Sequence, residues 1–406
     1  MADKFMIVIF DGIGDRPVKE LDDKTPLEAA DTPNLDKAAK KGINGLMDTI
    51  APGIIPGSDT GHLAILGYDP YEVYTGRGPF EAAGIDLDLK PGEVAFRCNF
   101  STMEDGKVVD RRAGRIKEGT DELAEAVNKI NLDVDFIFKE AVEHRGVLVL
   151  KDPDLGPFVS DVDAHECGVP PHKAKALEDT EEDKRTAEIL NDFTEKSYQA
   201  LKDHPVNKKR IEEGLPPANV VLPRGAGAVP HIIPIHKKHG IDGAAIAGIP
   251  LVRGVCKLAG MTPIDVDGAT GGLDTDIKAI FSGAVETLKS YDFVLINIKG
   301  PDLLGHDGKA VEKKEFIERI DKELDELIQL ENVYCVFTGD HSTPVSVKDH
   351  SGDPLPITIF GGEVRTDDVN RYGERSCAKG DLGRIKGTDL LNILLDLAKM
   401  GTKFGA

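Results

Sequence analysis

The chain has little positive charge, no cysteines at metal-binding spacing and no long hydrophobic run. Its 50 Lys and Arg residues stand against 71 Asp and Glu residues, which gives a formal net charge of −21. Because phosphate backbones bind basic surfaces, this charge argues against nucleic acid as a partner. The five cysteines are scattered and never form a C-x-x-C motif. That usage predicts a reduced, intracellular protein without a disulfide framework or a structural zinc knuckle.

Hydrophobic runs are short throughout the chain. No stretch approaches the ~18 apolar residues that a membrane span needs. The N-terminal run, residues 5–10, ends at Asp11 and does not resemble a signal peptide. We therefore expect a cytoplasmic protein with no membrane partner. Two motifs are also missing, since there is no G-x-S-x-G elbow and the glycines at 225–227 are too few for a dinucleotide fingerprint.

Four short apolar runs lead to, or lie close to, side chains of the types that bind metal ions. The runs are residues 5–10, 293–298, 333–338 and 356–360. Continuous runs of this kind predict strands buried on both faces, as in a parallel sheet. Helical patterns alternate with them, near residues 33–41, 59–67, 274–289, 310–330 and 387–399. The alternation predicts an α/β fold with a mostly parallel sheet flanked by helices.

Two domains are expected because 406 residues exceed the size at which a single core usually stops growing. The middle of the chain differs from both ends: residues 177–201 form a highly charged helical pattern, and a Pro- and Gly-rich passage follows at 214–230. Candidate ligands come from both ends, so both ends must form one domain. We predict a core domain from residues 1–87 and 239–406, with an inserted smaller α/β domain over 88–238.

Three carboxylates and three imidazoles flank the predicted strands: Asp11, Asp302, His306, Asp340, His341 and His350. In parallel sheets, ligands gather beyond the carboxyl ends of the strands. This mixed set suits Mn²⁺ or Zn²⁺ better than Mg²⁺ or Ca²⁺, and its size favours two ions over one. Asp302 and His306 are four positions apart, which places them on one face of a helical turn. Singly, each of these residues is more commonly an ordinary loop residue, so the prediction rests on the set.

Ser58 lies between Gly57 and Gly61 at the start of a predicted helix, where backbone N–H groups favour anions. A serine hydroxyl becomes a good nucleophile when a base or a metal ion lowers its pKa. Metal activation fits the other candidate ligands, and a helix-capping serine is the structural alternative.

The predicted insert contributes the arginines Arg97, Arg111, Arg112, Arg115 and Arg224. Arginine suits bidentate recognition of carboxylate and phosphate, and two of the five, Arg97 and Arg224, stand out for their apolar or glycine-rich surroundings. Residues 160–165 hold two aspartates and a histidine. They supply a general acid/base or form an ordinary polar loop.

Together these motifs resemble the archaeal type of cofactor-independent, that is 2,3-bisphosphoglycerate-independent, phosphoglycerate mutase, a family of the alkaline phosphatase superfamily. The resemblance runs over nearly the whole chain and rests on residues 10–12, 25–36, 56–62, 299–307 and 338–342. It implies an alkaline-phosphatase-like core. It also implies interconversion of 3-phosphoglycerate and 2-phosphoglycerate in glycolysis and gluconeogenesis, through a phosphoserine on Ser58 and without 2,3-bisphosphoglycerate.

The resemblance further implies roles for single residues. One divalent ion would be held by Asp11, Ser58, Asp340 and His341, and a second by Asp302, His306 and His350. Mn²⁺ is the expected metal, with Zn²⁺, Co²⁺ and Mg²⁺ as alternatives. Asp161 would be the acid/base, and the substrate contacts would be Arg97, Asp163, His165, Arg224 and Arg253. Val162 and Ala164 depart from the Thr and Pro of the family pattern.

Two other functions remain open at this point. One is a metal-dependent phosphomonoesterase or another phosphomutase of the superfamily, such as a phosphopentomutase, which would share the metal ligands. The other is an acidic metal-binding protein without activity, which explains the charge but not Ser58 between glycines. Release of phosphate from phosphoglycerate would favour the hydrolase, and interconversion of its two isomers would favour the mutase. The oligomeric state is left open.

Overall fold

The computed structural model describes residues 4–401, 403 and 405, which fold into two compact units. The first unit comprises Met1–Val73 and Ile232–Ala406, and the second comprises Tyr74–His231. The predicted insert, 88–238, therefore begins and ends too late. Helix α5 (Gly78–Gly84) packs on strands of the second unit. Beyond the insert, the Tyr68 hydroxyl donates to the carbonyl of Ile233, which ties that segment to the first unit.

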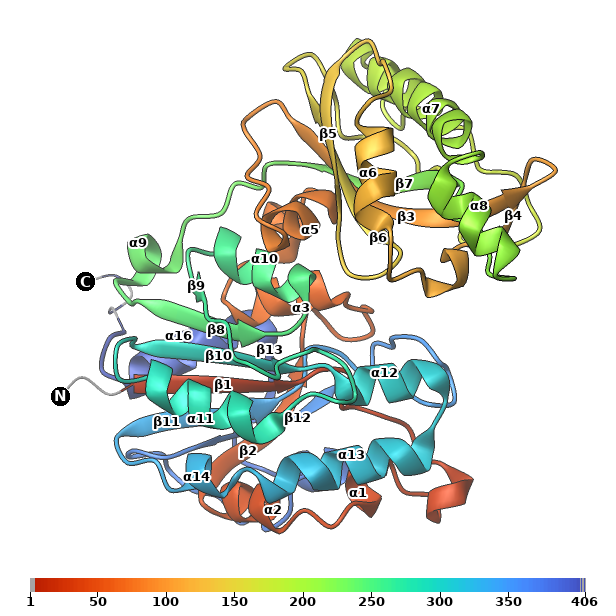
Figure 1. Cartoon of the computed structure of the whole chain (residues 1–406). Helices are drawn as coiled ribbons and strands as arrows, with labels where there is room; N and C mark the ends of the chain where they lie inside the picture. Colours follow the sequence, from red (N-terminus) through yellow and green to blue (C-terminus); the bar gives the residue numbers. More distant parts are fainter. Residues whose placement is uncertain (1–3, 402, 404, 406) are drawn as a thin grey trace. The chain divides into compact units, whose positions relative to one another are not determined.

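An eight-stranded sheet forms the centre of the first unit, in the order β13-β2-β12-β11-β1-β10-β8-β9 (Figure 1). Five of its seven neighbouring pairs are parallel, so the predicted mostly parallel sheet is confirmed. Its strands are β1 (Lys4–Phe10), β2 (Gly42–Asp48), β8 (Gly243–Ala247), β9 (Thr262–Pro263), β10 (Phe293–Ile298), β11 (Val333–Thr338), β12 (Leu355–Phe360) and β13 (Gly383–Lys386). The four apolar runs in the sequence are β1, β10, β11 and β12, and all but the first residue of β1 are buried in them.

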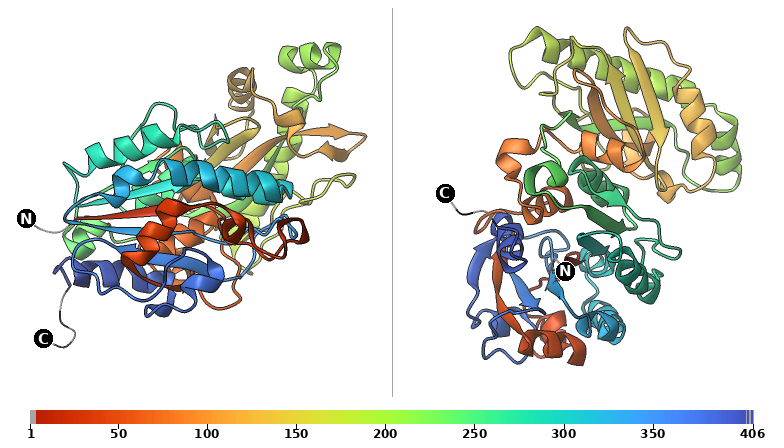
Figure 2. Two further views of the ribbon diagram at one scale, coloured as in Figure 1. Left: turned by 90° about the horizontal axis from the view of Figure 1, so that it is seen from below. Right: turned by 90° about the vertical axis from the view of Figure 1, so that its left-hand side faces the viewer.

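Helices cover both faces of this sheet (Figures 1 and 2). On one face α3 packs with α10 and α16, and on the other α13 packs with α1, α2 and α12. The helices of this unit are α1 (Pro26–Ala29), α2 (Pro33–Lys40), α3 (Ser58–Ile65), α4 (Pro70–Val73), α9 (Ile235–His239), α10 (Pro250–Leu258), α11 (Ile277–Thr287), α12 (Gly300–Asp307), α13 (Ala310–Lys322), α14 (Asp325–Ile328), α15 (Glu374–Cys377) and α16 (Gly387–Leu397). The single helix expected over 310–330 is thus two, α13 and α14.

Strand β12 runs antiparallel to both of its neighbours, β11 and β2. An antiparallel strand begins at the edge where its parallel neighbours end. Residues just before β12 therefore lie at the same edge as residues just after β1, β10 and β11. This reversal brings His350, which precedes β12, to the edge that carries the other candidate ligands.

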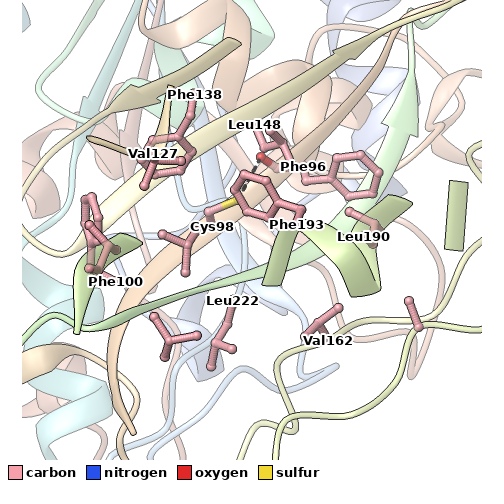
Figure 3. Close-up of a cluster of buried hydrophobic side chains, with 14 of the residues drawn as sticks. Phe96, Cys98, Phe100, Val127, Phe138, Leu148, Val162, Leu190, Phe193 and Leu222 are labelled. Carbon is pink, nitrogen blue, oxygen red and sulfur yellow. Dashed lines mark hydrogen bonds between the residues drawn. The ribbon is translucent and has the colours of Figure 1, made fainter. Parts of the chain in front are cut away.

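The second unit contains an antiparallel sheet of five strands: β3 (Val94–Glu104), β4 (Lys107–Asp110), β5 (Asp135–Glu140), β6 (Arg145–Lys151) and β7 (Val220–Ala228). Its helices are α5, α6 (Thr120–Val127), α7 (Glu181–Leu201) and α8 (Pro205–Glu212). One face of β3 carries Phe96, Cys98 and Phe100 into a core that includes Phe193 of α7 (Figure 3). The inserted unit is thus a helix-covered antiparallel sheet. In the part of the chain that the structure describes, no helix is both long and apolar enough to cross a membrane.

Candidate active site

The carboxyl ends of β10, β1 and β11, which are adjacent and parallel, bring three ligand-bearing segments together. Asp11 directly follows β1, Asp302 lies in the first turn of α12 after β10, and Asp340 and His341 follow β11. All four side chains are buried. Gly12 has a φ of +67°, and a Cβ atom there would lie 2.7 Å from the Cα atom of Asp302. The close approach of these two segments therefore requires glycine at position 12.

Ser58 is the first residue of α3, and its hydroxyl points into this cluster. Its Oγ atom lies 3.3 Å from Nε2 of His341 and 3.3 Å from Nζ of Lys299. Thr60 stabilises the start of the helix by accepting a hydrogen bond from the backbone N–H of Gly57. A Cβ atom on Gly61 would lie 2.7 Å from the carbonyl oxygen of Asp340, so glycine lets α3 approach the loop after β11.

The candidate ligands form two groups that share Asp302. One group is Asp302, His306 and His350, and the other is Asp11, Asp302 and His341; within each, the ligand atoms lie within 4.8 Å of one another. Oδ1 of Asp302 lies 3.4 Å from Nε2 of His306 and 3.5 Å from Nε2 of His350. Nε2 of His341 lies 3.4 Å from Oδ1 of Asp11 and 3.4 Å from Oδ2 of Asp340. All the candidate ligands expected from the sequence therefore meet in one cluster.

The histidine rings are oriented by hydrogen bonds at their other nitrogen. Nδ1 of His306 lies 3.0 Å from the carbonyl of Lys348, and Nδ1 of His350 lies 2.8 Å from the carbonyl of Pro56. A carbonyl can only accept, so Nδ1 carries the proton in both rings. In a neutral ring Nε2 then turns a lone pair toward the Asp302 carboxylate, whereas protonation of His350, whose pKa Asp302 raises despite burial, places an N–H there instead. Lone pairs facing a carboxylate repel it unless a cation lies between them, and this orientation is typical of metal-binding histidines.

Lys299 is the cation that the structure places among these carboxylates. Its Nζ atom lies 2.7 Å from Oδ1 of Asp11 and 2.7 Å from Oδ2 of Asp302. Burial opposes ionisation of both carboxyl groups, but Lys299 and the neighbouring histidines together outweigh it, so the pKa of each is lowered. Asp340 differs, because burial and the nearby Asp11 raise its pKa to about 6.

The residues present fit divalent metal ions. Oδ2 of Asp340 is buried and has no hydrogen-bond partner among the described residues. Three buried carboxylates surround one lysine, so the cluster lacks positive charge when its imidazoles are neutral. Mixed nitrogen and oxygen donors suit Mn²⁺ or Zn²⁺. These observations support the metal centre expected from the sequence without identifying the metal.

Two buried polar residues beneath the cluster escaped the sequence analysis. The Asn297 side chain donates to Oδ2 of Asp11 (2.9 Å) and lies 3.2 Å from Nε2 of His62, whose Nδ1 lies 2.7 Å from the carbonyl of Ser58. His62 therefore donates to Ser58 through Nδ1 and accepts from Asn297. This chain of hydrogen bonds joins the nucleophile candidate to Asp11. The polar Asn297 inside the apolar run 293–298 is the sequence signal that could have pointed to it.

The second unit holds a separate polar cluster around Asp161. Nε2 of His165 lies 3.0 Å from Oδ2 of Asp161, and its Nδ1 lies 3.3 Å from Nη2 of Arg111 and 3.2 Å from Nη1 of Arg224. Arginine only donates, so Nδ1 accepts and Nε2–H donates to Asp161. Arg111 also binds both oxygens of Asp163, at 2.8 and 2.6 Å. Asp163 is 1% exposed, which favours a positioning role over the direct substrate contact expected from the sequence.

Arg97 lies on the β3 face opposite to the aromatic core, directly across from Arg224 on β7. Arg97 is 8% exposed, and Nε of Arg97, of Arg145 and of Arg224 are buried without a hydrogen-bond partner among the described residues. Burial and the neighbouring Arg77 lower the pKa of Arg97, and Glu81, 3.6 Å away, is its acidic partner. Such a concentration of buried guanidinium groups favours binding of an anion.

Arg253 belongs to α10, which packs against α3, the helix that begins at Ser58. The Nη1 atom of Arg253 lies 2.6 Å from Oδ1 of Asp265. No hydrogen bond or ion pair of the described residues joins it to the Ser58 cluster. The phosphate contact expected of Arg253 stays a prediction.

Fold and site together define an α/β enzyme in which a serine hydroxyl faces carboxylates, imidazoles and a lysine at the edge of a parallel sheet. Comparison with known proteins narrows this class. A family model described as 2,3-bisphosphoglycerate-independent phosphoglycerate mutase matches residues 39–207. A protein of that name from Methanosphaera stadtmanae is 55% identical, with 99% of this chain and all of the relative covered. One from Methanocaldococcus jannaschii is 52% identical, with 99% of both chains covered.

Solved structures agree with this result. A Pyrococcus horikoshii protein is 41% identical over the full length of both chains, with a TM-score of 0.88. A cofactor-independent phosphoglycerate mutase from Thermoplasma acidophilum is 39% identical, covers 98% of this chain and 100% of its own, and gives a TM-score of 0.71. The chain belongs to the family of archaeal-type 2,3-bisphosphoglycerate-independent phosphoglycerate mutases, which are isomerases. The resemblance seen in the sequence is thereby confirmed, and the acidic metal-binding protein without activity is excluded.

Proposed function

We propose that this chain interconverts 3-phosphoglycerate and 2-phosphoglycerate through a phosphoserine on Ser58, with two divalent metal ions at the cluster around Asp302. The observation that carries the proposal is the position of Ser58 Oγ, 3.3 Å from both His341 and Lys299 at the centre of the candidate ligands. A hydroxyl in this place is surrounded by the groups that a phosphoryl group needs.

The proposed ligands follow the sequence assignment, with Asp11, Ser58, Asp340 and His341 around one ion and Asp302, His306 and His350 around the other. Bound there, divalent ions would lower the pKa of the Ser58 hydroxyl and neutralise charge on the phosphoryl oxygens. Lys299 adds a fixed positive charge beside the hydroxyl, so it stabilises the Ser58 alkoxide. Asn297 and His62 hold Asp11 and the start of α3 in place.

In the first transfer, Ser58 Oγ forms a bond to phosphorus and the bond between phosphorus and the C3 oxygen of the substrate breaks. The released oxygen takes up the proton that the Ser58 hydroxyl gives up, which leaves glycerate and a phosphoserine. In the second transfer, the C2 hydroxyl of glycerate attacks the phosphoserine. Asp161, oriented by His165 and the backbone N–H of Gly225, takes the proton from that hydroxyl. The Ser58 oxygen leaves and takes up a proton, Asp161 gives up the one it holds, and 2-phosphoglycerate is released.

The second unit supplies the groups proposed to hold the glycerate. Arg97 and Arg224 present buried guanidinium nitrogens, which suit the substrate carboxylate. Asp163 positions Arg111 and, by accepting from its backbone N–H at 3.0 Å, His165. His165 contacts the substrate beside Asp161.

The test is the conversion of 3-phosphoglycerate to 2-phosphoglycerate without added 2,3-bisphosphoglycerate, while phosphate release is followed in parallel. We expect isomerisation without net phosphate release from the native chain and none from Ser58→Ala, which still binds metal. Ser342→Ala is the matched control, because that buried hydroxyl donates only to a backbone carbonyl, at Asp353. Steady phosphate release by the native chain would favour the phosphomonoesterase. Isomerisation by Ser58→Ala would refute the phosphoserine.

A further inference from the structure

A fully buried lysine, Lys313, lies on α13 below the candidate active site and takes no part in the proposed chemistry. Its side chain is 0% exposed. Burying an ammonium group is costly unless it is paired and hydrogen-bonded, so a residue that served packing alone would be apolar. The contacts of the Lys313 ammonium group therefore indicate the structural role of its buried charge.

Among the described residues, every polar contact of the Lys313 ammonium group is made with one of two loops. From the loop after β1 it contacts the carbonyl of Gly12 at 2.8 Å, the carbonyl of Gly14 at 3.4 Å and Oδ2 of Asp15 at 2.8 Å. From the loop after β11 it contacts the carbonyl of Thr343 at 2.9 Å. The single ammonium group thus joins both loops to α13.

These two loops carry most of the candidate ligands. Gly12 follows Asp11, and its backbone N–H donates to Oδ1 of Asp340 at 3.3 Å. Thr343 reaches the ligands from the other loop, since its hydroxyl donates to Oδ1 of Asp302 at 2.7 Å and lies 3.1 Å from Nδ1 of His341. Lys313 is therefore connected to the candidate ligands through one intervening residue on each loop. Gly12 links it to Asp340, and Thr343 links it to Asp302 and His341.

Asp15 extends the same connection. Its carboxylate, buried with Lys313, also accepts from the backbone N–H of Val345 at 3.2 Å, so it too joins the loop after β1 to the loop after β11. The Lys313–Asp15 pair closes a ring of polar contacts between the two loops. An apolar side chain at position 313 could fill the space but could not close this ring.

We infer that Lys313 is a positioning residue, which fixes the loop after β1 and the loop after β11 relative to each other so that their ligands share one centre. The inference rests on the proposed metal centre. Lys313 acts through backbone carbonyls and Asp15, and it touches neither substrate nor ligand side chain. Loss of its ammonium group should loosen both loops and weaken metal binding while the rest of the fold persists.

The experiment compares Lys313→Met, the double variant Asp15→Asn with Lys313→Met, and Ile320→Ala. The double variant removes both buried charges, which keeps the test valid if the single variant does not fold. Ile320 is a buried residue on the same helix, and its truncation destabilises α13 without touching either loop. Mn²⁺ affinity is measured by calorimetry on metal-free protein. Amide hydrogen exchange of residues 11–15 and 341–345 is measured on the same metal-free samples.

We expect a Mn²⁺ affinity about 10- to 100-fold weaker in the Lys313 variants, the usual effect of removing groups that orient ligands. Exchange should rise in both loops, whereas Ile320→Ala keeps native affinity and native exchange there. Native Mn²⁺ affinity and native exchange in a folded Lys313 variant would overturn the inference. If the native chain itself binds no Mn²⁺, the proposed metal centre fails instead, and the exchange comparison alone decides the role of Lys313.

Discussion

Replacing Lys299 with methionine should destabilise the metal-free protein far more than it destabilises the metal-bound protein. Lys299 lies 2.7 Å from an oxygen of Asp11 and of Asp302, whose side chains are 0% and 2% exposed. The substitution leaves both carboxylates buried without their cation. Removing one partner of a buried ion pair costs about 3–5 kcal/mol. In a folding unit of this size that corresponds to a fall in Tm on the order of 10 °C.

Bound metal should reduce the loss of stability in Lys299→Met, because divalent ions would supply the missing positive charge. The stabilisation by saturating Mn²⁺ should then be larger for Lys299→Met than for the native chain. Activity should not recover with stability, since Lys299 lies 3.3 Å from Ser58 Oγ. Loss of one such stabilising group typically lowers kcat by about 10²- to 10³-fold.

Calorimetry in chelator and in Mn²⁺ measures both effects. Lys309→Met is the matched control, because Lys309 is a half-exposed lysine 4.0 Å from Asp307 and its loss should change stability by less than about 0.5 kcal/mol. If Lys299→Met unfolds in chelator at the same temperature as the native chain and the control, Lys299 does not balance the buried carboxylates.

Three further predictions concern the insert, the metals and pH. Asp161→Asn and Arg224→Ala should bind metal normally and lose mutase turnover by about 10²- to 10⁴-fold; near-native turnover in both would show that the substrate binds elsewhere. Chelation should abolish activity, and Mn²⁺ should restore it better than Mg²⁺ because imidazoles are among the ligands; full activity in chelator would rule this out. Burial and the nearby Glu28 raise the pKa of Glu374 from 4.5 to about 7, so the folded state binds this proton more tightly and Glu374 costs stability as pH rises through that interval. Glu374→Gln should thus gain about 1–3 kcal/mol over the native chain near pH 8 and almost nothing below about pH 4; equal denaturant midpoints near pH 8 would contradict this assignment.

The strands of the first unit could be predicted because burial on both faces leaves a continuous apolar run. The strands β1, β10 and β11 lie at the predicted positions, residues 5–10, 293–298 and 333–338. Whether each strand is parallel or antiparallel to its neighbours could not be predicted from such a run. The run 356–360 looks like the others, yet β12 is antiparallel, because strand direction depends on pairing partners far away in sequence.

The clustering of the candidate ligands was predictable because each member lies beside such a run, where side chains from distant segments converge. The positions of Lys299 and Lys313 among these groups were not predictable from the sequence. Surface lysines are common, and only the three-dimensional structure shows that these two are surrounded by acceptors. The start of the insert was also missed. Residues 78–84 form a short apolar helix, and the sequence does not say against which unit it packs.

The central claim is that Ser58 carries the phosphoryl group during turnover. The most direct measurement mixes Asp161→Asn, in which the second transfer is slowed, with 3-phosphoglycerate, quenches the mixture in acid and maps phosphorylated peptides by mass spectrometry. We expect one phosphoryl group on the peptide that contains Ser58, and none when Ser58→Ala is added to the same variant. A phosphoryl group on another residue, or isomerisation by a chain that lacks Ser58, would contradict it.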